Sequence, residues 1–176
     1  PYTTLFRSTF VLNQMGMAGC VGLFGHVGSG GKVSNVRVLD SYFSVNGGVG
    51  GVCGYNDGTL TNCYNAGMIN KLTDDYTYDF GGVCGYNTGT IIDCYNTGNV
   101  SGVNYNGGVC GDNDGTIINC YNTGGVSGDY HVGDICGDNY GATVTNCYYL
   151  SDTEIDHKDG TVGKTKEQFA NGEVAY

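Results

Sequence analysis

The chain has 176 residues, of which 33 are glycine, 15 tyrosine and one proline, and its formal net charge is −10. Such a composition does not describe an ordinary packed α/β domain, and no apolar run approaches the ~18 residues of a membrane-spanning helix. Between Leu72 and His157 there is no Lys or Arg, against eleven Asp and one Glu, so we expect neither nucleic-acid binding nor membrane insertion. An acidic chain rich in tyrosine and asparagine favours an extracellular location.

The first eight residues, PYTTLFRS, match the translation of a common short-read sequencing adapter over their whole length. We therefore set residues 1–8 aside as a scar that is foreign to the natural protein. On this interpretation the natural chain extends further on its N-terminal side, and the ending GEVAY indicates a fragment at the C-terminal side as well.

Residues 9–150 contain a tandem repeat. The stretch GGVCGYNTGTIIDCYNTG at residues 81–98 is preceded by GGVCGYNDGTLTNCYNAG and followed by GGVCGDNDGTIINCYNTG. A looser copy, GDICGDNYGATVTNCYYL, ends the series, and a degenerate unit with Phe24 and Val36 in the two cysteine columns begins it. The units lie near residues 22–38, 50–69, 81–102, 107–128 and 133–150. First cysteines recur after 31, 26 and 26 residues, an interval typical of a solenoid, propeller or array.

Aligning the units predicts which side chains point inward. One column is apolar throughout and is expected in the core: Val33, Leu60, Ile91, Ile117 and Val144. Two positions later comes an amide or carboxylate column: Asn35, Asn62, Asp93, Asn119 and Asn146. Asn and Asp tolerate left-handed backbone, so this column predicts a bend, and its stacked amides can hydrogen-bond from turn to turn.

The alignment therefore predicts an all-β fold, a right-handed parallel β-solenoid of about five coils. Each coil would have three short strands joined by corners rich in Gly, Asn and Asp, with coils ~4.8 Å apart. A β-propeller is the weaker alternative, because its blades usually need ~40 residues or more.

Eight cysteines occur in pairs within the units: Cys53 and Cys63, Cys84 and Cys94, Cys110 and Cys120, Cys136 and Cys147. Because the degenerate unit lacks both members, we expect the two cysteines of a unit to touch and to form a disulfide that compensates for a small core. Two alternatives stay open: reduced thiols acting as small core hydrophobes, and metal binding, for which the spacing without histidine is poor. Cys20 lies outside the columns and has no assigned partner.

Two further columns are candidate ligand sites. The tyrosine ladder, formed by Tyr64, Tyr95, Tyr121 and Tyr148, would bind a glycan or a host protein, or would only stabilise the stacked strands through ring contacts. Asp112 and Asp138 should stack on adjacent coils, and with Asp114 nearby they suggest a Ca²⁺ site; solvated corner carboxylates are the alternative. No other cofactor is expected.

The repeat pattern GGVCGYN-x-GT-[LI]-x-[ND]-CYN-x-G resembles the GLUG repeat of large bacterial surface and secreted proteins. The resemblance covers about residues 22–150, and it implies an extracellular repeat region, often near adhesins or immunoglobulin-cleaving peptidases. It transfers no catalytic residues, and the sequence contains no HExxH, no GxSxG and no phosphate-binding loop. Asp129 and Asp134 around His131 are the one acid/base cluster worth testing, with loop solvation as the alternative.

The remaining residues, 151–176, predict a polar linker and a short helix. TKEQ at residues 165–168 is a capping box, Asn171-Gly172 would end the helix, and Phe169 could cover the last coil. The chain is thus predicted to be a non-enzymatic structural or display module of an extracellular, adhesin-like surface protein joined to neighbouring domains. The alternatives are a glycan- or protein-binding module, and a remnant of a secreted peptidase or polysaccharide-active protein.

Overall fold

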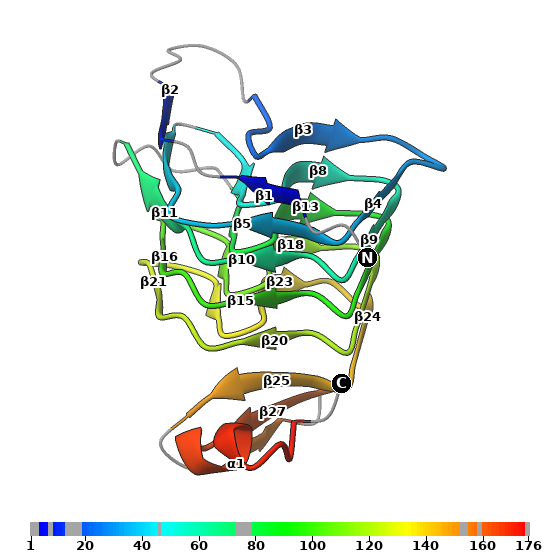
Figure 1. Ribbon diagram of the computed structural model, residues 1–176, viewed down its shortest axis with the longest axis vertical. Helices are drawn as coiled ribbons and strands as arrows, with labels where there is room; N and C mark the ends of the chain where they lie inside the picture. Colours follow the sequence, from blue (N-terminus) through cyan, green and yellow to red (C-terminus); the bar gives the residue numbers. More distant parts are fainter. Residues whose placement is uncertain are drawn as a thin grey trace.

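The computed structural model describes residues 4–6, 9–12, 19–45, 47–72, 79–151, 155–157 and 160–174. Within these residues the chain winds through about four complete turns of a parallel β-solenoid and ends in one short helix (Figure 1). The predicted all-β solenoid is confirmed. Its right-handedness stays a prediction.

Five sheets run along the solenoid, and each takes one short strand from every turn. The eight-stranded sheet consists, in spatial order, of β1 (Thr4–Phe6), β5 (Val36–Val38), β10 (Tyr64–Asn65), β15 (Tyr95–Asn96), β20 (Tyr121–Asn122), β25 (Cys147–Leu150), β27 (Thr161–Lys164) and β26 (Ile155–His157). The β2 sheet consists of β2 (Thr9–Leu12), β6 (Tyr42–Val45), β11 (Met68–Lys71), β16 (Val100–Ser101) and β21 (Val126–Ser127). The β7 sheet consists of β7 (Val49–Gly50), β12 (Phe80–Gly81), β17 (Asn106–Gly107) and β22 (Val132–Gly133).

The other two sheets hold most of the repeat motif. The β3 sheet consists of β3 (Phe24–Val27), β8 (Cys53–Asn56), β13 (Cys84–Asn87), β18 (Cys110–Asn113) and β23 (Cys136–Asn139). The β4 sheet consists of β4 (Lys32–Ser34), β9 (Thr59–Thr61), β14 (Thr90–Ile92), β19 (Thr116–Ile118) and β24 (Thr143–Thr145). All these pairings are parallel except the one between β26 and β27.

A full turn contains five short strands where the sequence predicted three. The second turn, for example, runs through β7, β8, β9, β10 and β11. Glycines lie at the extra corners: Gly51 lies between β7 and β8, and Gly67 lies between β10 and β11. A chain so often interrupted makes a solenoid of short, flat walls.

The repeat alignment predicted from the sequence matches the register of the strands. Phe24 pairs with Cys53 and Val33 with Leu60, so the degenerate first unit stacks on its neighbour as the alignment indicated. Leu60 pairs with Ile91, and Ile91 with Ile117, and all three are fully buried. The apolar column is therefore the central row of the core.

The predicted bend at the amide column is also confirmed. Asn35, Asn62, Asp93, Asn119 and Asn146 all have left-handed backbone, with φ between 51° and 58°. Their side chains form a ladder at the surface: the Nδ2 of Asn62 donates to Asn35 at 2.6 Å, that of Asn119 to Asp93 at 3.0 Å, and that of Asn146 to Asn119 at 2.7 Å. One side chain type thus supplies both the turn conformation and a contact between turns.

Two more asparagine ladders lie inside the solenoid, and the sequence did not predict them. Four residues form the longer one, in which each Nδ2 donates to the next Oδ1 at 2.7–2.8 Å: Asn56, Asn87, Asn113 and Asn139. The second joins Asn65, Asn96 and Asn122 at 2.8–2.9 Å. Each member caps its own corner as well, since Oδ1 of Asn65 accepts from the Gly67 amide and its Nδ2 donates to the Gly67 carbonyl.

The C-terminal part extends the eight-stranded sheet beyond the last turn. Strand β27 pairs in parallel with β25, and α1 (Lys166–Ala170) follows it. Thr165 is the N-cap and makes the predicted capping box with Gln168, while Asn171 is the C-cap and Gly172 has a φ of 74°. Of the predicted linker, residues 152–154 and 158–159 lie outside the described residues.

Candidate functional site

Three of the four residues of the tyrosine ladder stack on one another along the eight-stranded sheet: Tyr64, Tyr95 and Tyr121. The ring centroids of Tyr64 and Tyr95 are 4.2 Å apart with an interplanar angle of 20°, and those of Tyr95 and Tyr121 are 4.7 Å apart at 9°. Tyr148 continues the register after Tyr121. Because each inner ring face lies against a neighbouring ring, the ladder presents ring edges and hydroxyl groups to solvent.

A groove of about 530 Å³ runs beside this ladder. It is lined by Arg37, Asn62, Asp93, Tyr95, Asn119, Tyr121, Tyr148 and Val174. The asparagine corner thus forms one wall and the tyrosine edges the other. The lining offers a guanidinium, a carboxylate, amides and hydroxyls, a set suited to hydrogen bonding rather than to flat stacking of a sugar ring.

The C-terminal segment lies against one end of this groove. The ring of Phe169 is 5.9 Å from that of Tyr121, and Val174, which lines the groove, is 6% exposed. The predicted covering role of Phe169 is therefore seen at the side of the solenoid, on the tyrosine ladder.

The outward column of the β3 sheet consists of titratable side chains. In register from turn to turn it contains His26, Tyr55, Tyr86, Asp112 and Asp138. His26 contacts Asp57 at 2.9 Å, the Tyr86 hydroxyl donates to Asp114 at 2.5 Å, and His131 lies 3.6 Å from Asp138. Burial, with the carboxylates of Asp114 and Asp138, raises the pKa of Asp112.

Asp112 and Asp138 stack on adjacent turns as predicted, but the three predicted calcium ligands do not converge. The Asp114 carboxylate accepts a hydrogen bond from Tyr86, and Asp138 faces His131. Among the residues that the structure describes, no three His, Cys, Asp or Glu side chains are grouped so that they could hold a metal ion. Asp114 and Asp138 are thus partners of neighbouring side chains, and the calcium site stays a prediction.

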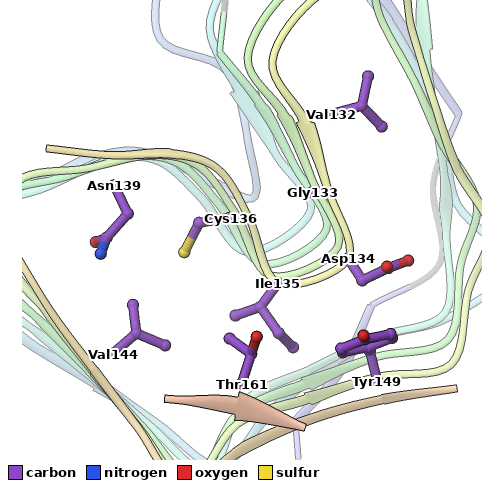
Figure 2. A pocket seen from close by; sticks show the side chains of 9 residues that line it. All are labelled: Val132, Gly133, Asp134, Ile135, Cys136, Asn139, Val144, Tyr149 and Thr161. Atoms are coloured by element: carbon purple, nitrogen blue, oxygen red, sulfur yellow. The ribbon is translucent and has the colours of Figure 1, made fainter. Parts of the chain in front are cut away.

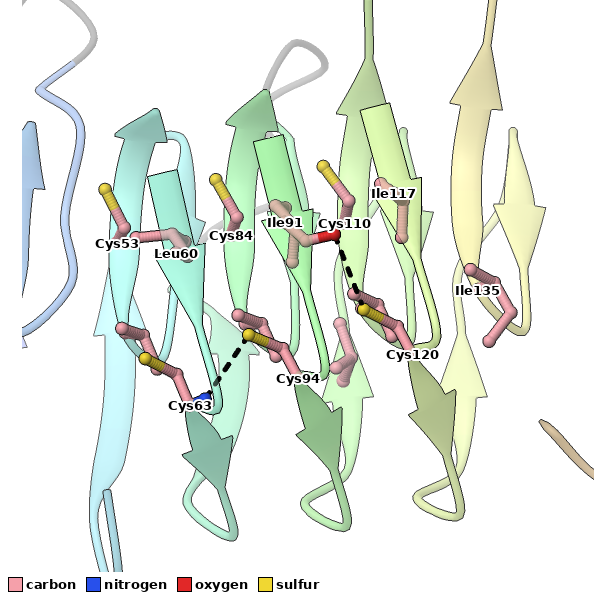
Figure 3. Close-up of a cluster of buried hydrophobic side chains, with 14 of the residues drawn as sticks. Cys53, Leu60, Cys63, Cys84, Ile91, Cys94, Cys110, Ile117, Cys120 and Ile135 are labelled. Carbon is pink, nitrogen blue, oxygen red and sulfur yellow. Dashed lines mark hydrogen bonds between the residues drawn. The ribbon is translucent and has the colours of Figure 1, made fainter. Parts of the chain in front are cut away.

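The cysteines form two separate rows, each built from the same position of successive turns (Figure 3). The first cysteine row consists of Cys53, Cys84, Cys110 and Cys136, which pair in register within the β3 sheet. The second cysteine row consists of Cys63, Cys94, Cys120 and Cys147, at the entrance to the eight-stranded sheet.

The predicted disulfides within a unit are not formed in this structure. No disulfide joins any of the nine cysteines, all of which the structure describes. Equivalent cysteines of successive turns instead lie in register: Cys53 pairs with Cys84, and the Cys63 amide donates to the Cys94 Sγ at 3.3 Å. Adjacent units rather than adjacent strands of one unit are the neighbours, because the apolar side chains of Leu60 and Ile91 occupy the interior beside the two rows (Figure 3).

The thiols behave as core side chains. Seven of the eight row cysteines are buried, and Cys136 is intermediate. Burial raises the pKa of Cys110 to about 11 and raises the pKa of Cys84 well above its ordinary value, so both thiols are protonated at neutral pH. This arrangement corresponds to the alternative in which the cysteines act as small hydrophobes.

A search of protein families matches residues 76–101 to the model described as the GLUG motif. This chain carries a GLUG-motif repeat region. The matched segment is one unit, and its neighbours at 50–69 and 107–128 repeat the same pattern in the same strand register. No curated protein and no solved structure matches the chain.

The acid/base cluster of Asp129, Asp134 and His131 stays a prediction, and the structure gives the contacts of His131 and the place of Asp134. His131 contacts Asp138 and stacks on Tyr105 with ring centroids 4.7 Å apart, while Asp134 lines a different pocket. Within the described part of the chain, no helix is long and apolar enough to cross a membrane.

That pocket lies at the open end of the last turn and measures about 350 Å³ (Figure 2). It is lined by Val132, Gly133, Asp134, Ile135, Cys136, Asn139, Val144, Tyr149 and Thr161. The pocket exists because β23 and β24 end their sheets, whereas β25 continues to β27. Sequence reasoning missed it, since the repeat pattern does not show which sheets continue beyond the last turn.

Proposed function

We propose that the GLUG region is a non-enzymatic structural module that spaces or displays neighbouring domains of an extracellular, adhesin-like bacterial surface protein. The observation that carries the proposal is that the buried asparagine ladders and the tyrosine ladder join side chains of successive turns. The buried asparagines bond to one another, and the tyrosine faces stack on one another. A repeat whose asparagine and tyrosine side chains bind its own turns to one another is expected to form a rigid rod.

The extracellular location rests on composition and on the resemblance rather than on the cysteines. The acidic stretch without Lys or Arg between Leu72 and His157 is soluble and repels anionic polymers. The bacterial surface proteins that share the repeat supply the rest of this part of the proposal.

The structural role is tested by applying the protein to arrays of immobilised glycans and host extracellular proteins and measuring how much of it is retained. We expect no saturable retention, together with a lower Tm for Tyr95→Ala, because each stacked ring contributes about 0.5–1.5 kcal/mol beyond its buried area. Tyr140→Ala is the matched control, since Tyr140 is 87% exposed and its loss should leave the Tm unchanged. Saturable binding that Tyr95→Ala abolishes without loss of fold would contradict the spacer role.

The second candidate function is binding of a glycan or an extended protein segment, and the groove beside the tyrosine ladder favours it. Its polar lining would recognise hydroxyl or amide groups through Arg37, Asn62 and Asp93. Retention on an array that Arg37→Ala weakens at least tenfold, with an unchanged Tm, would support this function. Retention unaffected by Arg37→Ala and by Asp93→Asn would place the binding elsewhere.

A further inference from the structure

The end pocket and the first cysteine row together carry a further inference. We propose that Cys136 and Cys110 are an oxidation site for small-molecule disulfides, and that their reaction links the last two turns of the solenoid covalently. The second cysteine row is sealed from the same reagents.

Cys110 and Cys136 lie close enough to form a disulfide. Cys110 and Cys136 are direct partners in the parallel pairing of β18 and β23. Neighbouring strands are ~4.8 Å apart, which lies within the ~4.4–6.8 Å between Cα atoms that a disulfide spans. A bond between turns therefore needs only a local adjustment, whereas the two cysteines of one unit belong to different rows.

A small molecule can reach the Cys136 sulfur from solvent. Cys136 is the member of the first row that is not fully buried, and it lines the pocket of about 350 Å³ at the open end of the last turn. Figure 2 shows its sulfur pointing into that space between Asn139 and Val144. The volume falls within the range of small-ligand pockets, so the disulfide end of a small molecule can reach the sulfur.

The second cysteine row differs from the first row in solvent access. Cys147 lies in the same last turn as Cys136, but β27 covers it: Cys147 pairs with Thr161, and its amide donates to the Gly160 carbonyl. Cys63, Cys94, Cys120 and Cys147 are each 0% exposed. A small-molecule disulfide can therefore react with the first cysteine row at Cys136 but not with the second cysteine row.

The reaction balances as two thiol–disulfide exchanges. The Cys136 thiolate attacks a disulfide RSSR, which forms the mixed disulfide of Cys136 with RS and releases one RS⁻, protonated to RSH. The Cys110 thiolate then attacks the Cys136 sulfur, forms the Cys110–Cys136 bond and releases the second RS⁻. Two protein thiols lose two protons and two electrons, and RSSR is reduced to two RSH.

The test uses the reduced full chain, oxidised glutathione and native buffer, followed by acid trapping and peptide mapping. Trypsin cannot resolve the linkages, because no Lys or Arg lies between Leu72 and His157. Cleavage before aspartate followed by chymotrypsin puts Cys94 and Cys110, and every other row cysteine, on separate peptides.

We expect a Cys110–Cys136 linkage as the main native product, with the second row still reduced. Native alkylation should label Cys20, which is exposed, and Cys136 at least about 100-fold faster than Cys147, which reacts only after local opening. Cys136→Ser should abolish the linkage, while Cys147→Ser, the matched change in the same turn, should leave it in place. A stable glutathione adduct at Cys136 without linkage, linkage within a unit, or equal oxidation of both rows would overturn the proposal.

Discussion

At the residue scale, buried asparagines fall into two kinds, and the difference lies in their hydrogen bonding. Asn87 is fully buried, accepts from Asn56 at 2.7 Å and donates to Asn113 at 2.7 Å. Asn106 is also fully buried, yet among the described residues neither its Oδ1 nor its Nδ2 has a hydrogen-bond partner. Asn87 is a member of a hydrogen-bonded ladder, whereas burial of the unsatisfied Asn106 amide lowers the stability of the folded state.

Asn87→Ala should lower the free energy of unfolding by about 2–4 kcal/mol. The change leaves the Nδ2 of Asn56 and the Oδ1 of Asn113 without their ladder partner in the core. Urea unfolding followed by circular dichroism measures the loss. Ser127→Ala, at an exposed position, is the control and should change stability by less than about 0.5 kcal/mol.

Asn106→Leu should raise the free energy of unfolding by about 1–2 kcal/mol, because an apolar side chain of similar shape removes an unsatisfied amide. Its register partners are Phe80 and Val132, which shows that the position accepts apolar groups. The same urea titration measures the gain. A loss of stability would mean that a water or another group satisfies the amide in solution.

Asp79 should make stability depend on pH. Burial, together with the Asp112 carboxylate, raises its pKa to about 6 from an ordinary 3.8. The folded state therefore binds this proton more tightly than the unfolded state between pH 4 and 6. Stability should fall as the pH rises through this window, by up to about 3 kcal/mol, and should be level above it.

Urea titrations at pH 4, 5, 6 and 7 measure this slope. Asp79→Asn should flatten most of it and should be more stable than the parent at pH 7, while Asp112, whose pKa is also raised, retains a smaller share. A slope of the opposite sign in the parent, or an unchanged slope in the variant, would show that Asp79 is not the group responsible.

At the scale of the element, glycine decides where each strand ends. A Cβ placed on Gly81 would lie 1.8 Å from the Cys84 carbonyl oxygen and 2.8 Å from the Gly111 amide nitrogen. Backbone therefore meets backbone at this corner, both within a turn and between turns. The same contact recurs at Gly107 and Gly133, so the tight corner is part of the repeat.

Gly81→Ala should destabilise the protein by several kcal/mol or prevent folding, since the opposing atoms belong to the main chain and cannot move aside independently. Gly28→Ala is the matched control, because nothing lies within 4 Å of its Cβ position and its backbone is not left-handed. Thermal unfolding of the two variants separates the outcomes. A Gly81→Ala protein with parental Tm would mean that the corner is wider in solution.

The sequence predicted those elements in which the residue type of an alignment column indicates a single structural role. The left-handed corner at Asn62 and the core row through Leu60 and Ile91 followed from residue type and spacing alone. The buried ladder through Asn87 did not, because an Asn before a glycine-containing turn reads as a surface turn residue. The arrangement of the cysteines in two rows could not be predicted for a related reason: the presence of both members in a unit does not distinguish contact within a unit from contact between units.

At the scale of the whole molecule, similarity between turns produces the architecture. Identical residues meet in register, so each favourable contact is repeated along the axis, and each turn depends mainly on its neighbours. The end turns have a neighbour on one side only, and the end pocket beside Cys136 is one result. Neither the pocket nor the position of α1 on the tyrosine ladder could be predicted, since both depend on where the repeat stops.

Hydrogen exchange should therefore be graded along the axis. Amides in the central turns, such as those of Cys84 and Ile91, should exchange more slowly than those of Cys136 and Thr143 in the last turn. Native-state exchange read by mass spectrometry measures this gradient. Uniform protection would indicate that the solenoid opens as a single cooperative unit.

The parallel register between turns is the claim on which the rest depends, and nuclear Overhauser contacts in labelled protein test it most directly. The account predicts backbone contacts of Ile91 with Leu60 and with Ile117, at the spacing of adjacent parallel strands. Contacts that instead pair the Cys53–Asn56 strand with the Thr59–Thr61 strand as an antiparallel hairpin would contradict the solenoid.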